Sequence, residues 1–247
     1  MSKRYLGGYI TTSFDPLSFT NEPVIENIPV STTNLIAYYD AGMTSSYPGS
    51  GTTWNDKVGT NHGTLTSGTS FVSTSPKYMS FDGVDDYVAF PLLSSSITNV
   101  TMQVWAYINL NTKGAIMRNG GGANGYSMGI GSNTMDTNGS EILGLYPNIR
   151  WIDTNTSYTA GWHLVTMVIS ASSVPSLYVD TTLIGTYTGT NPITPTTGTY
   201  LGRNIGDEGS GNRAFTGYIN SFWMYSTALD STAITSNYNA TKAKFGL

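Results

Sequence analysis

The regular alternation of short strand-like segments and turns is the sequence feature that most constrains the fold of this chain. From residue 35 onward, runs rich in Val, Ile, Tyr, Phe and Trp recur about every 8 to 15 residues, between clusters of Gly, Asn, Ser, Thr and Asp. The segment 100–108 (VTMQVWAYI) alternates in the way typical of a half-buried strand. The pattern predicts strands over 35–40, 77–81, 87–90, 100–108, 114–118, 142–146, 162–169, 176–179, 183–187 and 215–225.

Two further segments complete the expected architecture. Residues 164–169 are apolar on both faces, which indicates a central strand covered on each side. One short helix is expected near the C-terminal end, where Asp230 is a suitable N-cap and Leu229 and Ile234 occupy the two positions of a hydrophobic staple. The predicted fold class is therefore all-β, a two-sheet antiparallel jelly-roll sandwich with one short C-terminal helix.

Composition excludes several classes of function. The 247 residues include no cysteine, so disulfides, thiolate chemistry and cysteine-based zinc sites are excluded. The net charge is −4 and the eleven Lys and Arg residues are scattered, which disfavours nucleic-acid binding. We expect no membrane span, because there is no apolar run of about 18 residues, and no secretory signal, because the opening residues lack an apolar stretch.

Residues 1–33 differ from the remainder of the chain. Pro16, Pro23 and Pro29 separate short apolar pieces that have no periodicity of their own, and prolines favour extended backbone. A disordered terminus is the competing interpretation, but disordered tails are usually poor in aromatic residues. We therefore predict an extended docking arm over 1–33 and a folded domain over 34–247. The side chains expected to dock are Tyr5, Leu6, Tyr9, Ile10, Phe14 and Phe19.

Signals of catalysis are weak. A retaining glycosidase needs two carboxyl groups about 5 Å apart, and no predicted strand offers such a pair. The Gly-x-Ser-x-Gly motif of serine hydrolases and the phosphate-binding loop are also absent. His163 lies in a predicted strand beside Trp162, where packing is a commoner role than catalysis. We expect no catalytic residues and no enzymatic activity, with a glycoside hydrolase as the alternative.

Oxygen ligands suited to calcium gather in two loops. Asp82, Asp85 and Asp86 flank a turn between two predicted strands, where Asp side chains commonly bond the turn backbone, and we favour that structural role. The second loop is a weak metal candidate through Asn204, Asp207 and Glu208. No cofactor is therefore expected, with calcium as the open alternative.

One exposed aromatic residue suggests sugar binding. Aromatic rings stack on the C–H faces of sugars while neighbouring polar groups bond the hydroxyls. Trp151 is the best candidate, together with Tyr146, Arg150 and Asp153. Ordinary sheet surface is the competing interpretation of these residues.

Five landmarks, in this order, resemble the laminin-G-like, concanavalin A-like lectin/glucanase jelly rolls. They are LIAYYDAG at 35–42, FDGVDDYV at 81–88, VTMQVWAYI at 100–108, GWHLVTMVI followed by LYVD at 161–180, and FTGYINSFWMYSTALDSTAI from 215. The resemblance implies two curved antiparallel sheets. It also implies an Asp in the closing strand where this chain has Asn220, and a hydrolase carboxylate motif that this chain lacks, so it favours binding over cleavage.

The opening residues MSKRYLGGYITT resemble the N-termini of tailed-bacteriophage structural proteins. Together with the predicted arm, this resemblance implies a virion protein assembled in the host bacterial cytoplasm, either a capsid decoration or a tail or head appendage. The implied partners are other virion proteins, and an oligomer is expected. The alternative is a glycan-binding adhesin that recognises host-surface glycans, and the two roles are compatible.

Overall fold

A computed structural model describes residues 27–121, 124–132, 135, 137–146, 150–172, 174–186, 194–204 and 213–247. For residues 142–146 and 150–156 it describes the backbone only. The side chains predicted to dock in the arm, from Tyr5 to Phe19, lie outside the described residues. Among the helices of the described residues, none is long and apolar enough to cross a membrane.

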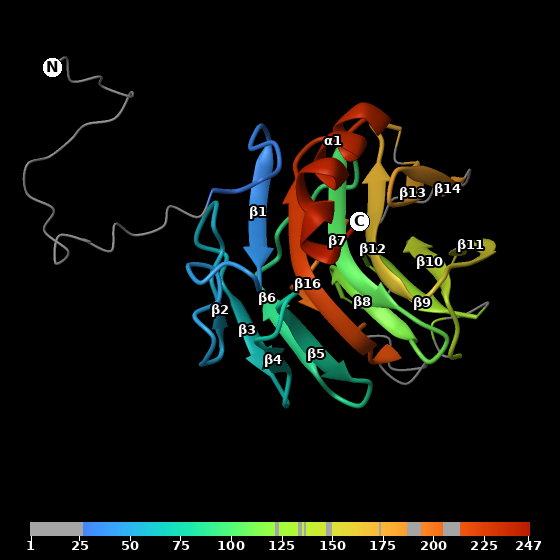
Figure 1. Ribbon diagram of the computed structural model, residues 1–247. Coiled ribbons are helices and arrows are strands. Elements are labelled where there is room, and N and C mark those ends of the chain that lie inside the picture. Colours follow the sequence, from blue (N-terminus) through green and yellow to red (C-terminus); the bar gives the residue numbers. More distant parts are fainter. Residues whose placement is uncertain are drawn as a thin grey trace, which may run out of the picture.

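The strands form two antiparallel sheets packed face to face (Figure 1). Sheet A runs in the order β14 (Thr182–Thr186), β13 (Pro175–Val179), β12 (Gly161–Ile169), β7 (Val100–Ile108), β16 (Thr216–Tyr225), β5 (Tyr78–Asp82) and β4 (Ser70–Val72), and β1 (Leu35–Asp40) also pairs with β16. Sheet B runs in the order β11 (Arg150–Ser157), β10 (Glu141–Tyr146), β9 (Tyr126–Gly131), β8 (Gly114–Asn119), β15 (Thr199–Leu201), β6 (Tyr87–Phe90), β3 (Gly63–Thr66) and β2 (Thr53–Trp54). This architecture confirms the predicted jelly-roll sandwich.

The core fills the space between the sheets, and alternation correctly predicts which face of β7 points into it. The expectation that β7 is half-buried is wrong, because its outer face is covered as well. In β7 the inward positions are apolar and fully buried, and in β12 the inward Val165 and Met167 join the same core cluster. The opposite face of β12 is also covered, because Leu164 belongs to a second cluster on the outside of sheet A. Residues 164–169 thus form the doubly covered central strand that their composition predicts.

The second cluster lies beneath the C-terminal helices. Helix α1 (Ser231–Thr241) and the 3-10 helix η2 (Lys242–Phe245) lie across part of the outer face of sheet A (Figure 1). Asp230 caps α1 as predicted, with its carboxylate accepting a hydrogen bond from the Ala233 amide at 2.8 Å. The buried side chains under this cover include Tyr38, Trp105, Leu164, Trp223 and Tyr225.

The last residues of the predicted arm contact the sandwich. Val30 is buried in the cluster under α1, and Ile28 packs against the same cluster. The Tyr225 hydroxyl donates to the Ser31 carbonyl at 3.0 Å. Residues 28–31 therefore join the preceding chain to the outer face of sheet A, close to α1.

Candidate functional site

Four aromatic rings form a continuous group on the part of the outer face of sheet A that α1 leaves uncovered. Tyr78, Tyr107, Trp162 and Tyr218 come from β5, β7, β12 and β16, and all four residues are half-buried. Ring centroids are 4.6 Å apart for Tyr78 and Tyr218, and 5.7 Å apart for each of the pairs Tyr107–Tyr218, Tyr107–Trp162 and Tyr78–Trp162. We call these four residues the aromatic platform.

Strand register places these rings together. Tyr107 lies opposite Tyr218 on one side and opposite Trp162 on the other. All three point outward because their neighbours in sequence, such as Ala106 and Ile219, point into the core. At one border Phe245 of η2 lies 4.9 Å from the Trp162 ring, so the platform begins where the helical cover ends.

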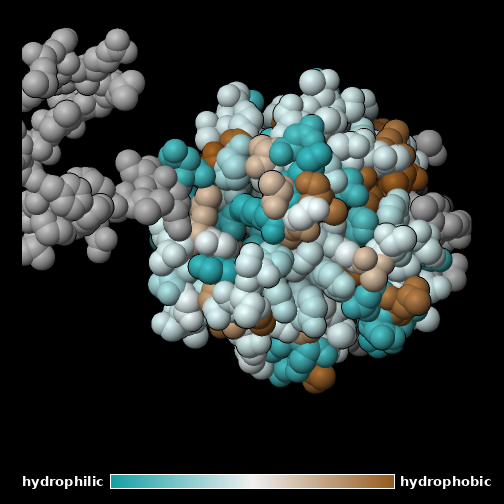
Figure 2. Space-filling view, viewed as in Figure 1, coloured by the Kyte–Doolittle hydropathy of each residue, from teal (hydrophilic) through white to brown (hydrophobic). Residues whose placement is uncertain are grey.

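The platform offers both apolar ring surface and hydroxyl groups. Burial, and to a smaller extent the neighbouring Tyr218, raises the pKa of Tyr78, so this phenol remains protonated and uncharged at neutral pH. Rings of this kind stack on sugar C–H faces, and their hydroxyls exchange hydrogen bonds with sugar hydroxyls. Figure 2 views this side of the molecule, whose centre is pale, the colour of residues with intermediate hydropathy.

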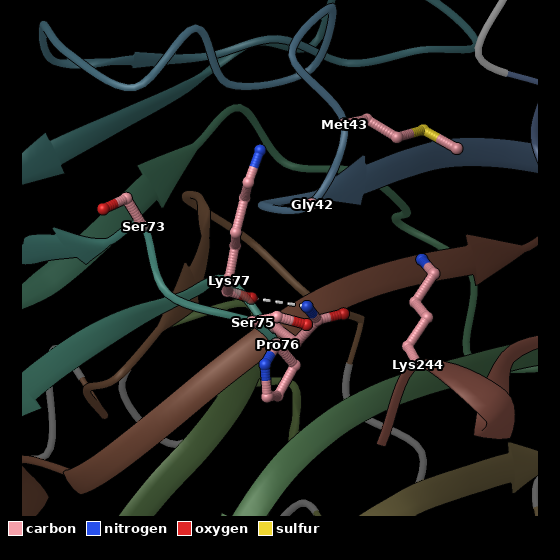
Figure 3. Close-up of a pocket in the computed structure, with 8 residues that line it drawn as sticks. Gly42, Met43, Ser73, Ser75, Pro76, Lys77 and Lys244 are labelled. Atoms are coloured by element: carbon pink, nitrogen blue, oxygen red, sulfur yellow. Dashed lines mark hydrogen bonds between the residues drawn. The ribbon is translucent and has the colours of Figure 1, made fainter. Parts of the chain in front are cut away.

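A pocket of about 430 Å³ opens in sheet A beside β16. Its lining includes Met43, Pro76, Lys77, Asn220 and Lys244, which come from the segment after β1, the segment before β5, β16 and η2 (Figure 3). Along one edge of β16, β5 pairs with residues 216–219 and β1 pairs with residues 221–225. The pocket therefore lies where one partner strand replaces the other.

Asn220 lies between the part of β16 that pairs with β5 and the part that pairs with β1. The register of β16 with β7 shifts between Ile219 and Ser221, so Asn220 is the extra residue of a bulge. Its carbonyl accepts a hydrogen bond from the Ala41 amide at 2.9 Å, and its side-chain amide donates to the Lys77 carbonyl at 2.5 Å. Bulges commonly redirect a side chain next to functional sites. Here the hydrogen bonds of the bulged residue connect β16 to the segment after β1 and to the segment before β5, both of which line the pocket.

Two lysines, Lys77 and Lys244, line the pocket, and Lys244 pairs with a buried carboxylate. Asp40 is fully buried and forms an ion pair with Lys244. It also accepts hydrogen bonds from the Gly42 amide at 2.8 Å and the Tyr38 hydroxyl at 3.1 Å. Burial and the charge of Asp40 raise the pKa of Tyr38 well above its usual value, so Tyr38 remains a neutral donor to this carboxylate.

The predicted sugar-binding residues lie on the other sheet. Tyr146 ends β10 and faces Arg150 in the backbone register, while Trp151 of β11 faces Leu145. This hairpin forms one edge of sheet B. The side chains of Tyr146, Arg150, Trp151 and Asp153 lie outside the described part of the structure, so their role in glycan binding stays a prediction.

The acidic turn between β5 and β6 has the backbone contacts expected of a structural turn. Asp82 accepts from the Val84 amide at 2.8 Å, and Asp86 accepts from the Asp82 amide at 2.9 Å. Burial raises the pKa of Asp86, while the Asp82 amide opposes this shift. One oxygen from each of Asp82, Asp85 and Asp86 lies within 4.8 Å of the others, so these residues could also hold a cation.

In the second predicted calcium loop, Asn204 is buried, whereas Asp207 and Glu208 lie outside the described residues. Calcium binding there stays a prediction.

His163 forms a specific polar contact. Its Nδ1 lies 2.9 Å from the Asp180 carboxylate, and its Nε2 lies 3.1 Å from the Thr159 carbonyl. Burial lowers the pKa of His163, but the hydrogen bond and the charge of Asp180 raise it by more. The pKa of His163 is therefore above its usual value. Asp180 also accepts from the Leu164 amide at 3.0 Å, which ties the start of β12 to the β13–β14 turn.

Comparison with known proteins places this sandwich in a family. Residues 82–235, more than half of the chain, match the concanavalin A-like lectin/glucanases superfamily, and the chain belongs to that superfamily. This assignment agrees with the landmarks in the sequence. A search of curated protein sequences found no match.

Solved structures with the same fold include enzymes and a toxin. The sialidase of Trypanosoma rangeli in complex with sialic acid aligns with a TM-score of 0.61 and 13% identity, covering 87% of this chain and 34% of the sialidase chain. A structure of botulinum neurotoxin type C, whose cell entry depends on two ganglioside molecules, aligns with a TM-score of 0.62 and 14% identity, covering 84% of this chain and 51% of that chain. The chain therefore spans about a third of the sialidase and half of the toxin chain.

These similarities contradict the expectation that the chain is not an enzyme, because sialidases contain this fold. That expectation rested on the absence of a carboxylate pair, of the serine hydrolase motif and of the phosphate-binding loop. Sialidases use a tyrosine nucleophile instead, so a search for paired carboxylates does not detect them. The fold occurs in enzymes and in a ganglioside-dependent toxin alike, and function depends on the site that it carries.

Proposed function

We propose that this protein binds glycans on the aromatic platform of sheet A. The observation that carries the proposal is the group of four adjoining, half-buried rings on a sheet face that α1 leaves uncovered. The sialic acid complex of the sialidase and the ganglioside dependence of the neurotoxin support sugars as the ligand class. Trp162 and Tyr218 would provide the stacking surface, and the neutral Tyr78 hydroxyl would provide a hydrogen bond.

A glycan array followed by titration of the best ligand tests this function. Trp162→Ala and Tyr218→Ala should each weaken binding by at least about tenfold, equivalent to about 1.4 kcal/mol. Tyr200→Ala is the matched control, because Tyr200 is also half-buried and makes an edge-to-face contact with a tyrosine, Tyr87, but belongs to sheet B. Unchanged binding in both platform variants would contradict the proposal. Loss of binding in Trp151→Ala alone would move the site to the β10–β11 hairpin.

A second proposal concerns where the sandwich is displayed. We propose a virion structural protein whose arm docks on other virion proteins through residues such as Tyr5, Tyr9 and Phe14. The aromatic-rich, proline-punctuated sequence of residues 1–26 supports docking, as does the resemblance of its opening to phage structural proteins. Burial of a large apolar side chain contributes about 1.5 to 3 kcal/mol before the cost of ordering, so several together could hold the domain on a particle.

Deletion of residues 2–26 tests the display role. The deletion retains Ile28 and Val30, which pack on the outer face of sheet A, so the domain should stay folded. Incorporation into particles should be lost, as measured by the presence of the chain in purified particles and by its density in cryo-electron microscopy maps. Normal incorporation of the deletion variant would rule out docking by the arm, and absence of the full chain from particles would rule out a virion role.

A further inference from the structure

The pocket and the aromatic platform are built from neighbouring residues of the chain. Lys77 directly precedes Tyr78, Asn220 follows Tyr218 by two residues, and Lys244 directly precedes Phe245, which borders the platform. Because β16 and the start of β5 contribute to both features, and η2 lines the pocket and borders the platform, a ligand on the platform would have its end beside the pocket. The pocket is thus placed to bind the terminal group of a ligand whose next unit stacks on Tyr78 and Tyr218.

The charged side chains at the pocket leave one positive charge without a partner in the part of the chain that the structure describes. Lys244 pairs with the buried Asp40, and these two charges offset each other. Lys77 lines the same pocket and forms no ion pair with any of the described residues. Figure 3 shows the side chains of Lys77 and Lys244 extending in the same general direction on either side of Gly42. One uncompensated ammonium group favours a ligand with a single negative charge.

The pocket also contains an acceptor that lacks a donor. Asn220 is 1% exposed, and its Oδ1 has no hydrogen-bond partner among the described residues. The orientation of this amide is fixed, because only its NH2 group can donate to the Lys77 carbonyl. A buried acceptor without a partner is costly, and a ligand hydroxyl would satisfy it. Met43 and Pro76 add apolar surface to the same pocket.

We propose that the pocket binds a terminal sugar that carries one negative charge, a carboxylate or a sulfate. The anionic group would contact the Lys77 ammonium, a sugar hydroxyl would donate to Asn220 Oδ1, and the C–H groups would lie against Met43 and Pro76. The next sugar would stack on the platform, so this inference rests on the proposed glycan binding. A charge-assisted hydrogen bond is stronger than a neutral one, which makes Lys77 the residue that selects acidic over neutral glycans.

Glycan pairs that differ only in the charge of the terminal sugar test this inference. One pair compares a carboxylated sugar with its methyl ester, and another compares a sulfated sugar with the unsulfated form. The wild-type protein should bind the charged member about tenfold more tightly, equivalent to about 1.4 kcal/mol. Lys77→Gln should abolish this preference while neutral binding is retained, and the preference should weaken as salt is raised.

The control variant is Lys113→Gln. Lys113 is also half-buried, but it bridges Thr216 at the other end of the β5-paired part of β16, so the preference should survive its removal. Lys244 is unsuitable for substitution because its loss would leave Asp40 buried without its cation. Three results would overturn the inference and leave glycan binding intact. They are equal binding of the charged and neutral members, a preference that survives Lys77→Gln, and a preference that Lys113→Gln also abolishes. Absence of binding to any glycan would overturn both.

Discussion

The outer face of sheet A carries two aromatic groups that differ in what covers them. Under α1 and η2, Trp105 and Trp223 are completely buried and their indole N–H groups are hydrogen-bonded within the protein. On the uncovered part, Tyr218 is only half-buried although it lies on β16 like Trp223, and so is Trp162 on β12, the strand that pairs with the Trp105 strand β7. The same sheet face thus serves as core in one part and as accessible surface in the other, and the C-terminal helices determine which.

The covered part also has a polar network that the platform lacks among its described residues. Gln103 accepts hydrogen bonds from the Trp223 indole at 2.8 Å and from the Asn237 side chain of α1 at 2.7 Å. Asn237 donates in addition to the Tyr225 hydroxyl at 3.0 Å. Buried polar groups that are fully paired fix one arrangement of a core. The network therefore holds α1 in the position that leaves the platform open.

Paired tryptophan substitutions should separate the two parts most strongly. Trp223→Ala removes a fully buried ring that stacks on Tyr38, and should lower the free energy of unfolding by about 3 to 5 kcal/mol. Trp162→Ala removes a half-buried ring and should cost about 1 to 2 kcal/mol. Denaturant unfolding of both variants measures the difference. Equal losses would mean that the platform is part of the core rather than a binding surface.

The network should give the next largest effect. Asn237→Ala removes the donor to Gln103 and Tyr225 in a buried setting, and should cost about 1 to 3 kcal/mol of unfolding free energy. Asn239→Ala is the matched control, because Asn239 is exposed on the same helix and alanine favours helix formation. Chemical denaturation of the two variants compares them. A similar stability in both would show that the network does not hold the helix.

Sequence patterns alone predicted most of the sandwich but not its site. Alternation in β7 and the apolar run in β12 were sufficient because a strand with one or two buried faces leaves a local signature. The strand β9 (YSMGIG) was missed because it is rich in glycine, and its Gly129 is needed where an added Cβ would lie 2.4 Å from Met135 Sδ. Such packing depends on residues distant in space and has no local signal.

The platform illustrates the same limit for function. Alternation with the inward Ala106 and Ile108 could have placed Tyr107 on the outer face. The meeting of its ring with Trp162 and Tyr218 depends on the strand order β12-β7-β16, which joins segments far apart in the chain. The pocket depends on the exchange of β5 for β1 along β16, which is also non-local.

Removal of the N-cap of α1 should have a smaller effect on stability than the substitutions above. Asp230→Ala removes the hydrogen bond to the Ala233 amide and should cost about 1 kcal/mol, whereas Asp230→Ser should retain most of the stability. Because the cap lies at the start of α1, its loss should also speed hydrogen exchange at the Trp105 indole, which donates to Thr241 at the end of this helix. Exchange that stays unchanged while stability falls would show that the helix end does not open separately.

The smallest expected effect on stability is at the start of β12, the strand that carries Trp162 of the platform. The start of β12 is held by the contact of His163 with Asp180, which raises the pKa of His163 above its usual 6.5. A folded-state pKa above the unfolded value means that the protonated form stabilises the fold. This contribution is complete below the unfolded pKa and is lost as the pH rises through the higher folded pKa. The loss of unfolding free energy in His163→Gln should therefore be larger at pH 5.5 than at pH 8.5, as measured by denaturation at both values. A loss that is independent of pH would mean that His163 acts through its neutral hydrogen bonds, so that charge would not anchor this end of the platform.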